Sequence, residues 1–236
     1  MELLLMNLRT TFLAAAIGTL SVPAMAADLT VKITNLTQGI AFTPLLVAGH
    51  NADTTLFSVG EAASANLQAM AEGGSIAGLS GDVSGAGGVV GENPAGGLLM
   101  AGKSTMTDID TGTNTQLSIV AMMLPTNDGF VALNNLTIPT TPGTYTYNLN
   151  AYDAGTEAND EIRGSGVPGE SGFPVPPPLE GEVGTGGTGV DAVAEGFVHI
   201  HRGVLGDTSS DSGVSDIDST VHRWLNPVAR VTVTVK

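Results

Sequence analysis

The chain has 236 residues and a formal net charge of −15, with 23 acidic and 8 basic side chains. Nucleic acid is a poor partner for it, because duplex binding depends on lysine and arginine neutralising phosphates. Cysteine is absent, so the chain has neither disulfides nor a thiol nucleophile. A bound cation is another way to fix long loops.

The amino-terminal residues have the layout of a secretory signal. Arg9 precedes an apolar run over residues 12–22, and an A-x-A cleavage pattern ends at Ala26. The run is about half the roughly 20 residues that a membrane-spanning helix needs, which favours cleavage over anchoring. We therefore predict a signal peptide at residues 1–26, one domain at residues 27–236, and export to the periplasm or the extracellular space, with no integral membrane segment after cleavage.

Alternating apolar and polar residues predict half-buried strands, because strand side chains point to opposite faces in turn. Residues 29–33 and 228–235 show this pattern, and residues 116–124, 144–152 and 196–201 are predicted as further strands. One helix is predicted over residues 61–72, where Leu67 and Met70 fall at helical spacing and Gly73 and Gly74 follow. These elements predict an all-β fold, an antiparallel β-sandwich with one short packed helix.

Glycine-rich segments are predicted as long loops. Residues 73–102 hold eleven glycines, and residues 164–189 hold nine glycines and five prolines, with few apolar side chains to bury. Residues 207–218 hold four aspartates among serines and are predicted to form a solvated acidic loop. Residues 108–112 start like an EF-hand loop, but the glycine comes one residue early and Ile119 replaces the closing glutamate, so we predict a turn.

Carboxylates collect in two turns that follow predicted strands. Asp128 lies in an Asn-Asp-Gly turn, and Asp153 and Glu157 flank a glycine-containing turn. Calcium takes six to eight oxygens from carboxylates, carbonyls and water, which turns at strand ends can bring together. One interpretation is a calcium site of these three residues, with Asp160 as a possible substitute for Glu157. The other is that Asp128 and Asp153 only cap their turns.

Two histidines form a second, weaker candidate for a metal site. His199 and His201 lie two apart on a predicted strand and therefore on one face, and His50 and His222 are candidates to approach them. Such a pair can hold zinc or copper if a third ligand converges. Paired histidines on a strand are more often hydrogen-bonded structural residues.

Three motifs resemble a known family when they are taken in order. They are LFSVGEAASANL (residues 56–67), TNDGF (residues 126–130) and AYDAGTE (residues 151–157). Together with NPVARV near the carboxyl terminus, they resemble the spondin amino-terminal domain of F-spondin and mindin and its bacterial relatives. The tyrosine-aspartate-alanine-glycine-threonine-acid run is the most specific part of this resemblance.

The resemblance implies an antiparallel β-sandwich similar to calcium-dependent lipid-binding modules, with a calcium ion at one end. It therefore favours calcium at Asp128, Asp153 and Glu157. The animal members are matrix proteins that act in adhesion and pattern recognition. This chain departs from them in lacking cysteines and thrombospondin-type repeats, so their partners are not carried over.

No catalytic motif accompanies these features: a G-x-S-x-G elbow and a P-loop are both missing from the sequence. Asp128 and Asp153 could pair for glycoside hydrolysis, but aromatic residues make up 4% of the chain, too few for a sugar-stacking surface. We predict a non-enzymatic, calcium-stabilised binding or adhesion module for a surface glycan, a protein or a matrix polymer. A self-associating matrix or fibre component, hence a homo-oligomer, is the alternative, and a hydrolase is a remote one.

Overall fold

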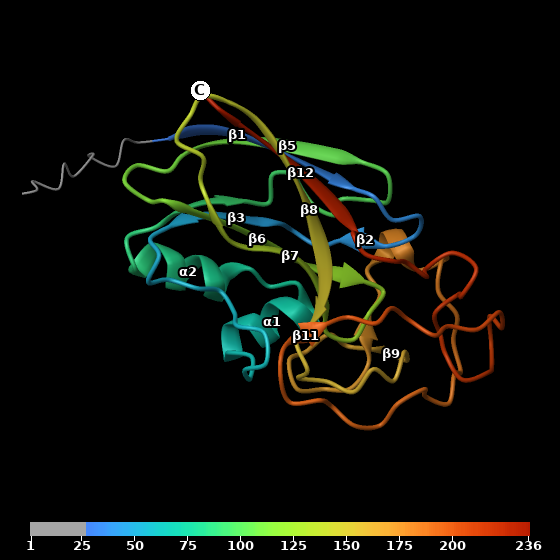
Figure 1. Ribbon diagram of the computed structural model, residues 1–236. Coiled ribbons are helices and arrows are strands. Elements are labelled where there is room, and N and C mark those ends of the chain that lie inside the picture. The colour runs from blue at the N-terminus through green and yellow to red at the C-terminus, as the bar shows by residue number, and fades with distance from the viewer. Residues whose placement is uncertain (1–26) are drawn as a thin grey trace, which may run out of the picture.

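The computed structural model describes residues 27–236, and the predicted signal peptide lies outside the described residues (Figure 1). In chain order the elements are β1 (Asp28–Asn35), β2 (Ala41–Phe42), β3 (Leu46–His50), α1 (Ala65–Gly73), α2 (Ala77–Gly85), β4 (Val89–Glu92), β5 (Ser104–Asp110), β6 (Gln116–Leu124), β7 (Gly129–Thr137), β8 (Gly143–Asp153), β9 (Arg163–Gly164), β10 (Phe173–Pro174), a 3₁₀ turn (Pro177–Leu179), β11 (His199–Ile200) and β12 (Ala229–Val235). Within this part of the chain, no helix is long and apolar enough to cross a membrane.

The main sheet is antiparallel and follows the order β4-β3-β6-β7-β8-β12-β1-β5. The long strand β8 belongs to both layers, because residues 143–149 pair with β12 and residues 150–153 pair with β7. Figure 1 shows it passing from the layer of β1, β5 and β12 to the layer of β3, β6 and β7. The two ends of the sheet approach each other, since Thr105 of β5 donates to the carbonyl oxygen of Pro94, 2.7 Å away. The all-β antiparallel sandwich is confirmed.

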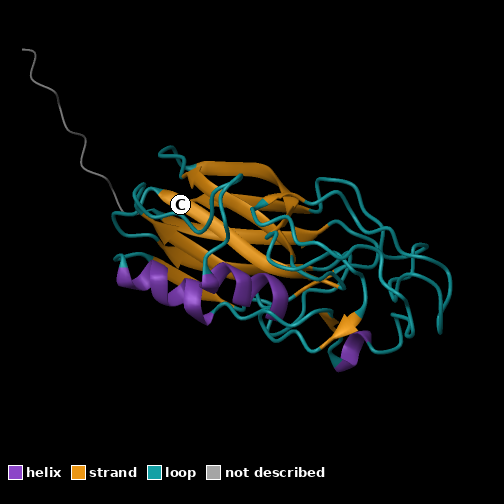
Figure 2. Cartoon of the chain, turned by 90° about the horizontal axis from the view of Figure 1, so that it is seen from below, coloured by secondary structure: helices purple, strands orange, loops and turns teal. Residues whose placement is uncertain are grey.

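Strand β6 is buried on both faces. Leu117, Ile119 and Ala121 point into the core between the two layers. Val120 and Met122 point the other way and pack with residues of α1 and α2. Figure 2 shows these helices lying along one face of the sheet, with the loops gathered at the far end. Double burial explains why residues 116–124 are an almost continuous apolar run.

Helix α1 is shorter than predicted at its start. It begins at Ala65, because the Ser64 side chain caps it by accepting from the Leu67 backbone N–H at 3.1 Å. The predicted end is confirmed, since Gly74 adopts a left-handed conformation with φ 71° and its N–H reaches the carbonyl oxygen of Met70.

The prediction that residues 73–102 form a loop was wrong, because this segment contains α2 and β4. Leu79 and Val83 lie one helical turn apart and are buried in the cluster beneath the sheet. Tertiary packing of this pair outweighs the low helix propensity of the glycines around it.

Residues 164–189 pack more closely than predicted. Phe173 is fully buried, and Leu179 is 1% exposed. Phe173 also pairs with Arg163 in the short parallel β9–β10 sheet. The expectation that this segment has little to bury was therefore wrong.

Residues 207–218 are only partly solvated. Asp207 is polar and accessible as predicted, but Ile217 and Asp216 are 1% and 2% exposed. The Asp216 carboxylate accepts from the backbone N–H groups of Arg163 (2.9 Å) and Gly187 (2.8 Å). A solvated acidic loop is therefore wrong for the second half of this segment.

Two smaller expectations need correction. Asp108 and Asp110 lie in β5, where Ile109 pairs with Leu29, so the predicted turn starts only after the strand. The Asp108 carboxylate accepts from the ammonium group of Lys236 at 2.9 Å, which accounts for its charge without a metal. The strand predicted over residues 196–201 is reduced to His199–Ile200 in β11.

Candidate metal centre

Three elements place the candidate residues at the loop end of the sandwich. Asp128 lies in the turn between β6 and β7, and Asp153 is the last residue of β8. In the sheet register Asp153 stands between Gly129 of β7 and His199 of β11. The β11 label in Figure 1 accordingly lies at the lower end of β8. The turn that holds Asp128, the end of β8 at Asp153 and strand β11 with His199 therefore meet at one place.

Asp128 is fully buried and half satisfied. Its Oδ2 accepts from the backbone N–H groups of Thr156 (2.7 Å) and Glu157 (3.1 Å), whereas its Oδ1 has no hydrogen-bond partner. Burial, and then the charge of Asp153, raise the pKa of Asp128 to about 8. No lysine or arginine of residues 27–236 forms an ion pair with this carboxylate. A cation at Oδ1 would relieve both deficits, so Asp128 fits a metal.

Asp153 is 1% exposed and is held by its neighbours through both oxygens. Oδ1 accepts from the N–H of Gly155 and Oδ2 from the side-chain amide of Asn159, each at 2.8 Å. Each oxygen also faces a histidine: Nε2 of His199 lies 3.6 Å from Oδ1, and Nε2 of His201 lies 3.9 Å from Oδ2.

Glu157 and Asp160 meet at an amide. The Asn127 side chain donates to Oε1 of Glu157 at 2.8 Å and to Oδ1 of Asp160 at 2.7 Å. The N–H of Gly172 also donates to Oε1 of Glu157, whose Oε2 has no partner. Burial raises the pKa of Glu157 to about 7. The charge of Glu157 raises the pKa of Asp128, so the two carboxylates lie close together. The hydrogen bond from Asn127 nevertheless holds Oε1 of Glu157 toward Asn127.

One set of ligand atoms within the described residues lies within 4.8 Å of one another, and it comes from Asp153, Glu195 and His199. Oε1 of Glu195 lies 3.7 Å from Nε2 of His199, and it is 3.4 Å from the Asn159 amide that also holds Asp153. Sequence reasoning missed Glu195 because its segment has no helical or strand periodicity. The only available signal was an acid four residues before a histidine.

The two histidines of the predicted pair have different roles. Nδ1 of His199 lies 3.0 Å from the carbonyl oxygen of Ile200, whereas Nδ1 of His201 accepts from the N–H of Gly203 at 3.0 Å. His201 is buried beside Trp224, with ring centroids 5.0 Å apart. Burial lowers the pKa of His201 to about 4, against the opposing charge of Asp153.

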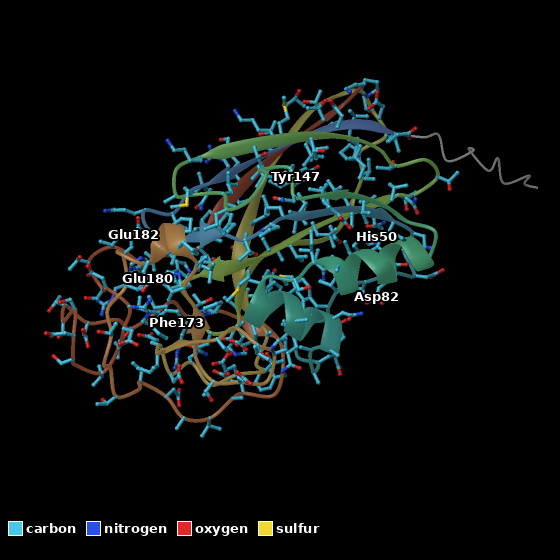
Figure 3. All side chains as sticks on the ribbon, turned by 180° about the vertical axis from the view of Figure 1, so that it is seen from behind. His50, Asp82, Tyr147, Phe173, Glu180 and Glu182 are labelled. Carbon is cyan, nitrogen blue, oxygen red and sulfur yellow. The ribbon has the colours of Figure 1, made fainter. Side chains whose placement is uncertain are left out.

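Neither of the other two histidines belongs to this set of grouped ligand atoms, and Nδ1 of His222 lies 3.2 Å from the carbonyl oxygen of Asp218. His50 pairs with Gln116 at the start of β6, whereas Asp128 follows the end of that strand. Figure 3 shows His50 far from Phe173 and the loop end. Its Nε2 is 2.8 Å from the Ser118 hydroxyl, which supports a structural role. The expected approach of His50 to His199 was therefore wrong.

Gly155 explains part of the motif around Asp153. It has φ +67°, and an added Cβ would lie 2.3 Å from the carbonyl oxygen of Phe197. The N–H of Gly196 also donates to the carbonyl oxygen of Gly155 at 2.8 Å. Only glycine combines this conformation with this close approach. The turn after β8 can therefore hold the segment that carries Glu195 and His199.

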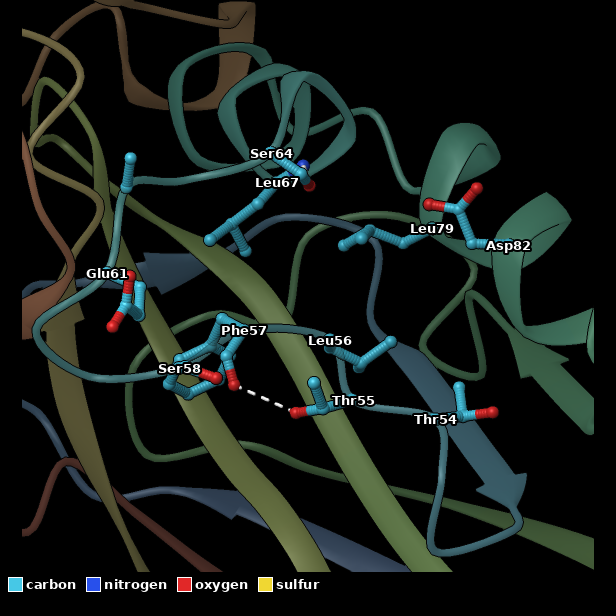
Figure 4. A pocket seen from close by; sticks show the side chains of 11 residues that line it. Thr54, Thr55, Leu56, Phe57, Ser58, Glu61, Ser64, Leu67, Leu79 and Asp82 are labelled. Atoms are coloured by element: carbon cyan, nitrogen blue, oxygen red, sulfur yellow. Dashed lines mark hydrogen bonds between the residues drawn. The ribbon is translucent and has the colours of Figure 1, made fainter.

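A separate cavity of about 380 Å³ lies between the loop of residues 54–64 and the two helices (Figure 4). Leu67 and Leu79 line it, and the hydroxyl of Thr55 donates to the carbonyl oxygen of Phe57 at its rim. Its acidic residues, Glu61 and Asp82, come from its two sides. It carries no grouped donor set comparable to that of the loop end.

The fold and the site define an all-β sandwich module with a candidate cation centre among the loops at one end. The Spondin_N family model matches residues 34–164, more than half of the chain, and the chain belongs to this family. The match includes Asp128, Asp153 and Glu157, whereas Glu195 and His199 lie beyond it. No curated protein matches the chain.

Proposed function

We propose that this chain is an exported, non-catalytic binding module of the adhesion type, and that calcium stabilises its loop end. Membership of the Spondin_N family supports an extracellular, adhesion-type role. The observation that carries the calcium proposal is the pair of buried carboxylates, Asp128 and Asp153. Burial and the charge of Asp153 raise the pKa of Asp128, and no lysine or arginine of the described chain forms an ion pair with either carboxylate.

Calcium suits the oxygens that these turns supply. Asp128 and Asp153 would hold the ion, and backbone carbonyls and water complete the six to eight oxygens that it takes. Glu157 would contribute only if its Oε2 turned toward Asp128, because Oε1 is engaged by Asn127. A bound ion would supply positive charge that offsets the charges of the two carboxylates. The chain's own residues fix the turns around the ion, because Asp128 and Asp153 accept hydrogen bonds from backbone N–H groups of these turns.

A partner surface is supported around the same end. Val193, Phe197 and Ile200 are 71%, 45% and 46% exposed, and they flank Glu195 and His199 along one segment. Exposed apolar side chains rimmed by polar groups are typical of interaction sites. This segment would therefore contact the glycan, protein or matrix polymer that the module binds.

Self-association through open sheet edges has less support. Strands β4 and β5 end the sheet path, yet the hydrogen bond from Thr105 to Pro94 draws these two edges together. An edge that faces its own sheet offers less backbone to a second copy. The homo-oligomer therefore stays a prediction that sedimentation with and without calcium can test.

The binding role is tested by pull-down from the native envelope and growth medium, with Ca²⁺ or a chelator. Wild type should capture a partner in Ca²⁺, and Asp128→Asn should capture much less at equal concentration. Asp211→Asn is the matched control, because Asp211 is exposed and lies outside the centre. Capture by wild type that chelator does not reduce, or capture by Asp128→Asn that equals wild type in Ca²⁺, would contradict the calcium-dependent module.

A further inference from the structure

His199 presents an unprotonated nitrogen to two carboxylates. A carbonyl oxygen can only accept, so the contact of Nδ1 with Ile200 places the proton on Nδ1 and leaves a lone pair on Nε2. That Nε2 has no hydrogen-bond partner. It lies 3.6 Å from Oδ1 of Asp153 and 3.7 Å from Oε1 of Glu195. Three acceptors therefore face one another with no hydrogen between them.

The geometry points to a metal ion between these acceptors: we propose that Asp153, Glu195 and His199 bind a transition metal of the Zn²⁺ class. Zinc ligands lie about 2.0–2.1 Å from the metal, so ligand atoms in a tetrahedral site are roughly 3.3 Å apart. The two separations from Nε2 of His199 need only a small contraction to reach that value, and the ligand oxygens of Asp153 and Glu195 lie within 4.8 Å of each other. A histidine whose Nδ1–H is held by a carbonyl and whose Nε2 faces the metal is the usual arrangement.

The donor set separates this site from the calcium proposal. Calcium takes oxygen ligands, whereas imidazole nitrogen favours zinc, copper and related ions. Three protein ligands leave a fourth position open. The side chains of His199 and Glu195 are 25% and 24% exposed although Nε2 of His199 is itself buried, so solvent lies near the site and the fourth position can take water or a donor from a partner.

The surrounding residues are arranged to hold the ligands. The Asn159 amide reaches both Asp153 (2.8 Å) and Glu195 (3.4 Å), which keeps the two carboxylates together. His201 is buried, and its Nδ1 accepts from Gly203, so its Nε2 carries the proton. That unpartnered Nε2–H lies 3.9 Å from Oδ2 of Asp153, too far for a hydrogen bond. His201 thus faces Asp153 with a proton instead of a lone pair and is not a ligand, which separates the roles of the histidine pair.

The zinc site stands apart from calcium at Asp128, although both use Asp153. Zn²⁺ titration by calorimetry on metal-free protein should give one site per chain. Glu195→Gln and His199→Gln should each weaken Zn²⁺ binding at least about 10- to 100-fold, the loss typical of residues that merely support ligands. Glu61→Gln, the same change at an exposed position, should bind as wild type does. Asp128→Asn should lose the calcium response and keep Zn²⁺.

Nitrogen NMR of the histidine rings distinguishes a metal ligand from a residue with only a structural role, because only a ligand nitrogen shifts when Zn²⁺ is added. Zn²⁺ should shift the Nε2 resonance of His199 and leave His201 in its Nε2–H form. Co²⁺ in place of Zn²⁺ should give the visible absorption of a four- or five-coordinate ion, which Glu195→Gln removes. The proposal is overturned if Zn²⁺ does not bind, if both variants bind like Glu61→Gln, or if His201 alone responds. Failure of zinc with an intact calcium response would leave the proposed function standing.

Discussion

Replacing Asp128 by asparagine separates the charge of this carboxylate from its structural hydrogen bonds. An asparagine oxygen can still accept from Thr156 and Glu157, as Oδ2 of Asp128 does. The substitution puts a neutral NH₂ group where Oδ1 has no partner. We expect Asp128→Asn to lose the stabilisation by calcium and to change how metal-free stability depends on pH.

The size of the pH effect follows from the raised pKa of Asp128. Moving it from 3.8 to about 8 disfavours the ionised form in the folded chain by on the order of 5 kcal/mol. Because the pKa of Asp128 is higher in the folded chain than in the unfolded one, folding favours the protonated carboxyl group. The folded state is therefore most stable below the unfolded pKa and loses stability as pH rises toward 8. Between pH 6 and 8 metal-free wild type should lose about 2 kcal/mol relative to Asp128→Asn. For a domain of this size that is roughly 4–8 °C in Tm.

The assay is thermal melting of both proteins in chelator and in millimolar calcium, at pH 6 and pH 8. Glu157 and His201 also titrate with shifted pKa values, but both proteins contain them, so their effects largely cancel in the difference. For wild type, calcium should add on the order of 0.4 to 4 kcal/mol, for dissociation constants from millimolar to micromolar. Parallel pH curves in chelator, or an undiminished calcium shift in the variant, would refute the reasoning.

Three further outcomes are expected. Gly155→Ala should cost at least about 1–2 kcal/mol for its left-handed backbone and should displace Phe197. Gly60→Ala is the control, because Gly60 has φ +87° but open space around it, and this variant should leave the segment of Phe197 in place. Equal NMR shifts of that segment in the two variants would contradict this prediction. Phe173→Ala should cost about 3–5 kcal/mol in urea unfolding, and a loss below 1 kcal/mol would mean that residues 164–189 do not anchor there. Amino-terminal sequencing of exported protein should begin near Ala27, and an intact Met1 would contradict cleavage.

The strands that form the sandwich could be predicted because each leaves a local trace. Residues 229–235 alternate between buried and accessible positions along β12, as strand periodicity requires. The same rule fits β1 and most of β8. Strand β6 was predictable for a different reason, since its apolar run is too short for a membrane span and ends at a proline.

The regions that resisted prediction depend on contacts between distant segments. Helix α2 has glycines at positions 78, 81 and 85, and only the burial of Leu79 and Val83 against the sheet favours it. Phe173 is one aromatic residue within a glycine- and proline-rich stretch, so composition hides its role as an anchor. Propensity and composition describe neighbours in sequence and do not record such packing.

The candidate site was predictable in part for the same reason. Asp128 follows β6 and Asp153 ends β8. Both strands pair antiparallel with β7 between them, so their carboxyl-terminal ends lie at the same edge of the sheet. Glu157 was assigned to the site by proximity in sequence, but Asn127 holds its Oε1. Glu195 joins Asp153 through the short β8–β11 pairing and the glycine contact at Phe197, neither of which leaves a periodic pattern.

The acidity of this cysteine-free chain has a structural use beyond solubility. Buried carboxylates join loops that are distant in sequence: Glu161 accepts from the N–H groups of Leu205 and Gly206, and Asp216 accepts from that of Gly187. Glu72 likewise accepts from the N–H of Gly169. Each such carboxylate obtains N–H donors, so none requires a metal.

The loop end breaks this rule. Within residues 27–236, seven buried side-chain nitrogen and oxygen atoms lack a hydrogen-bond partner, and five of them belong to residues at or beside the candidate centre: Asp128, Glu157, Glu195, His199 and His201. Buried polar groups are normally paired, because an unpaired one costs about 1–3 kcal/mol. Four of these five atoms, those of Asp128, Glu157, Glu195 and His199, are acceptors. A chain that satisfies its other buried carboxylates with backbone donors has left these acceptors close together, where a cation would complete them in place of an N–H group.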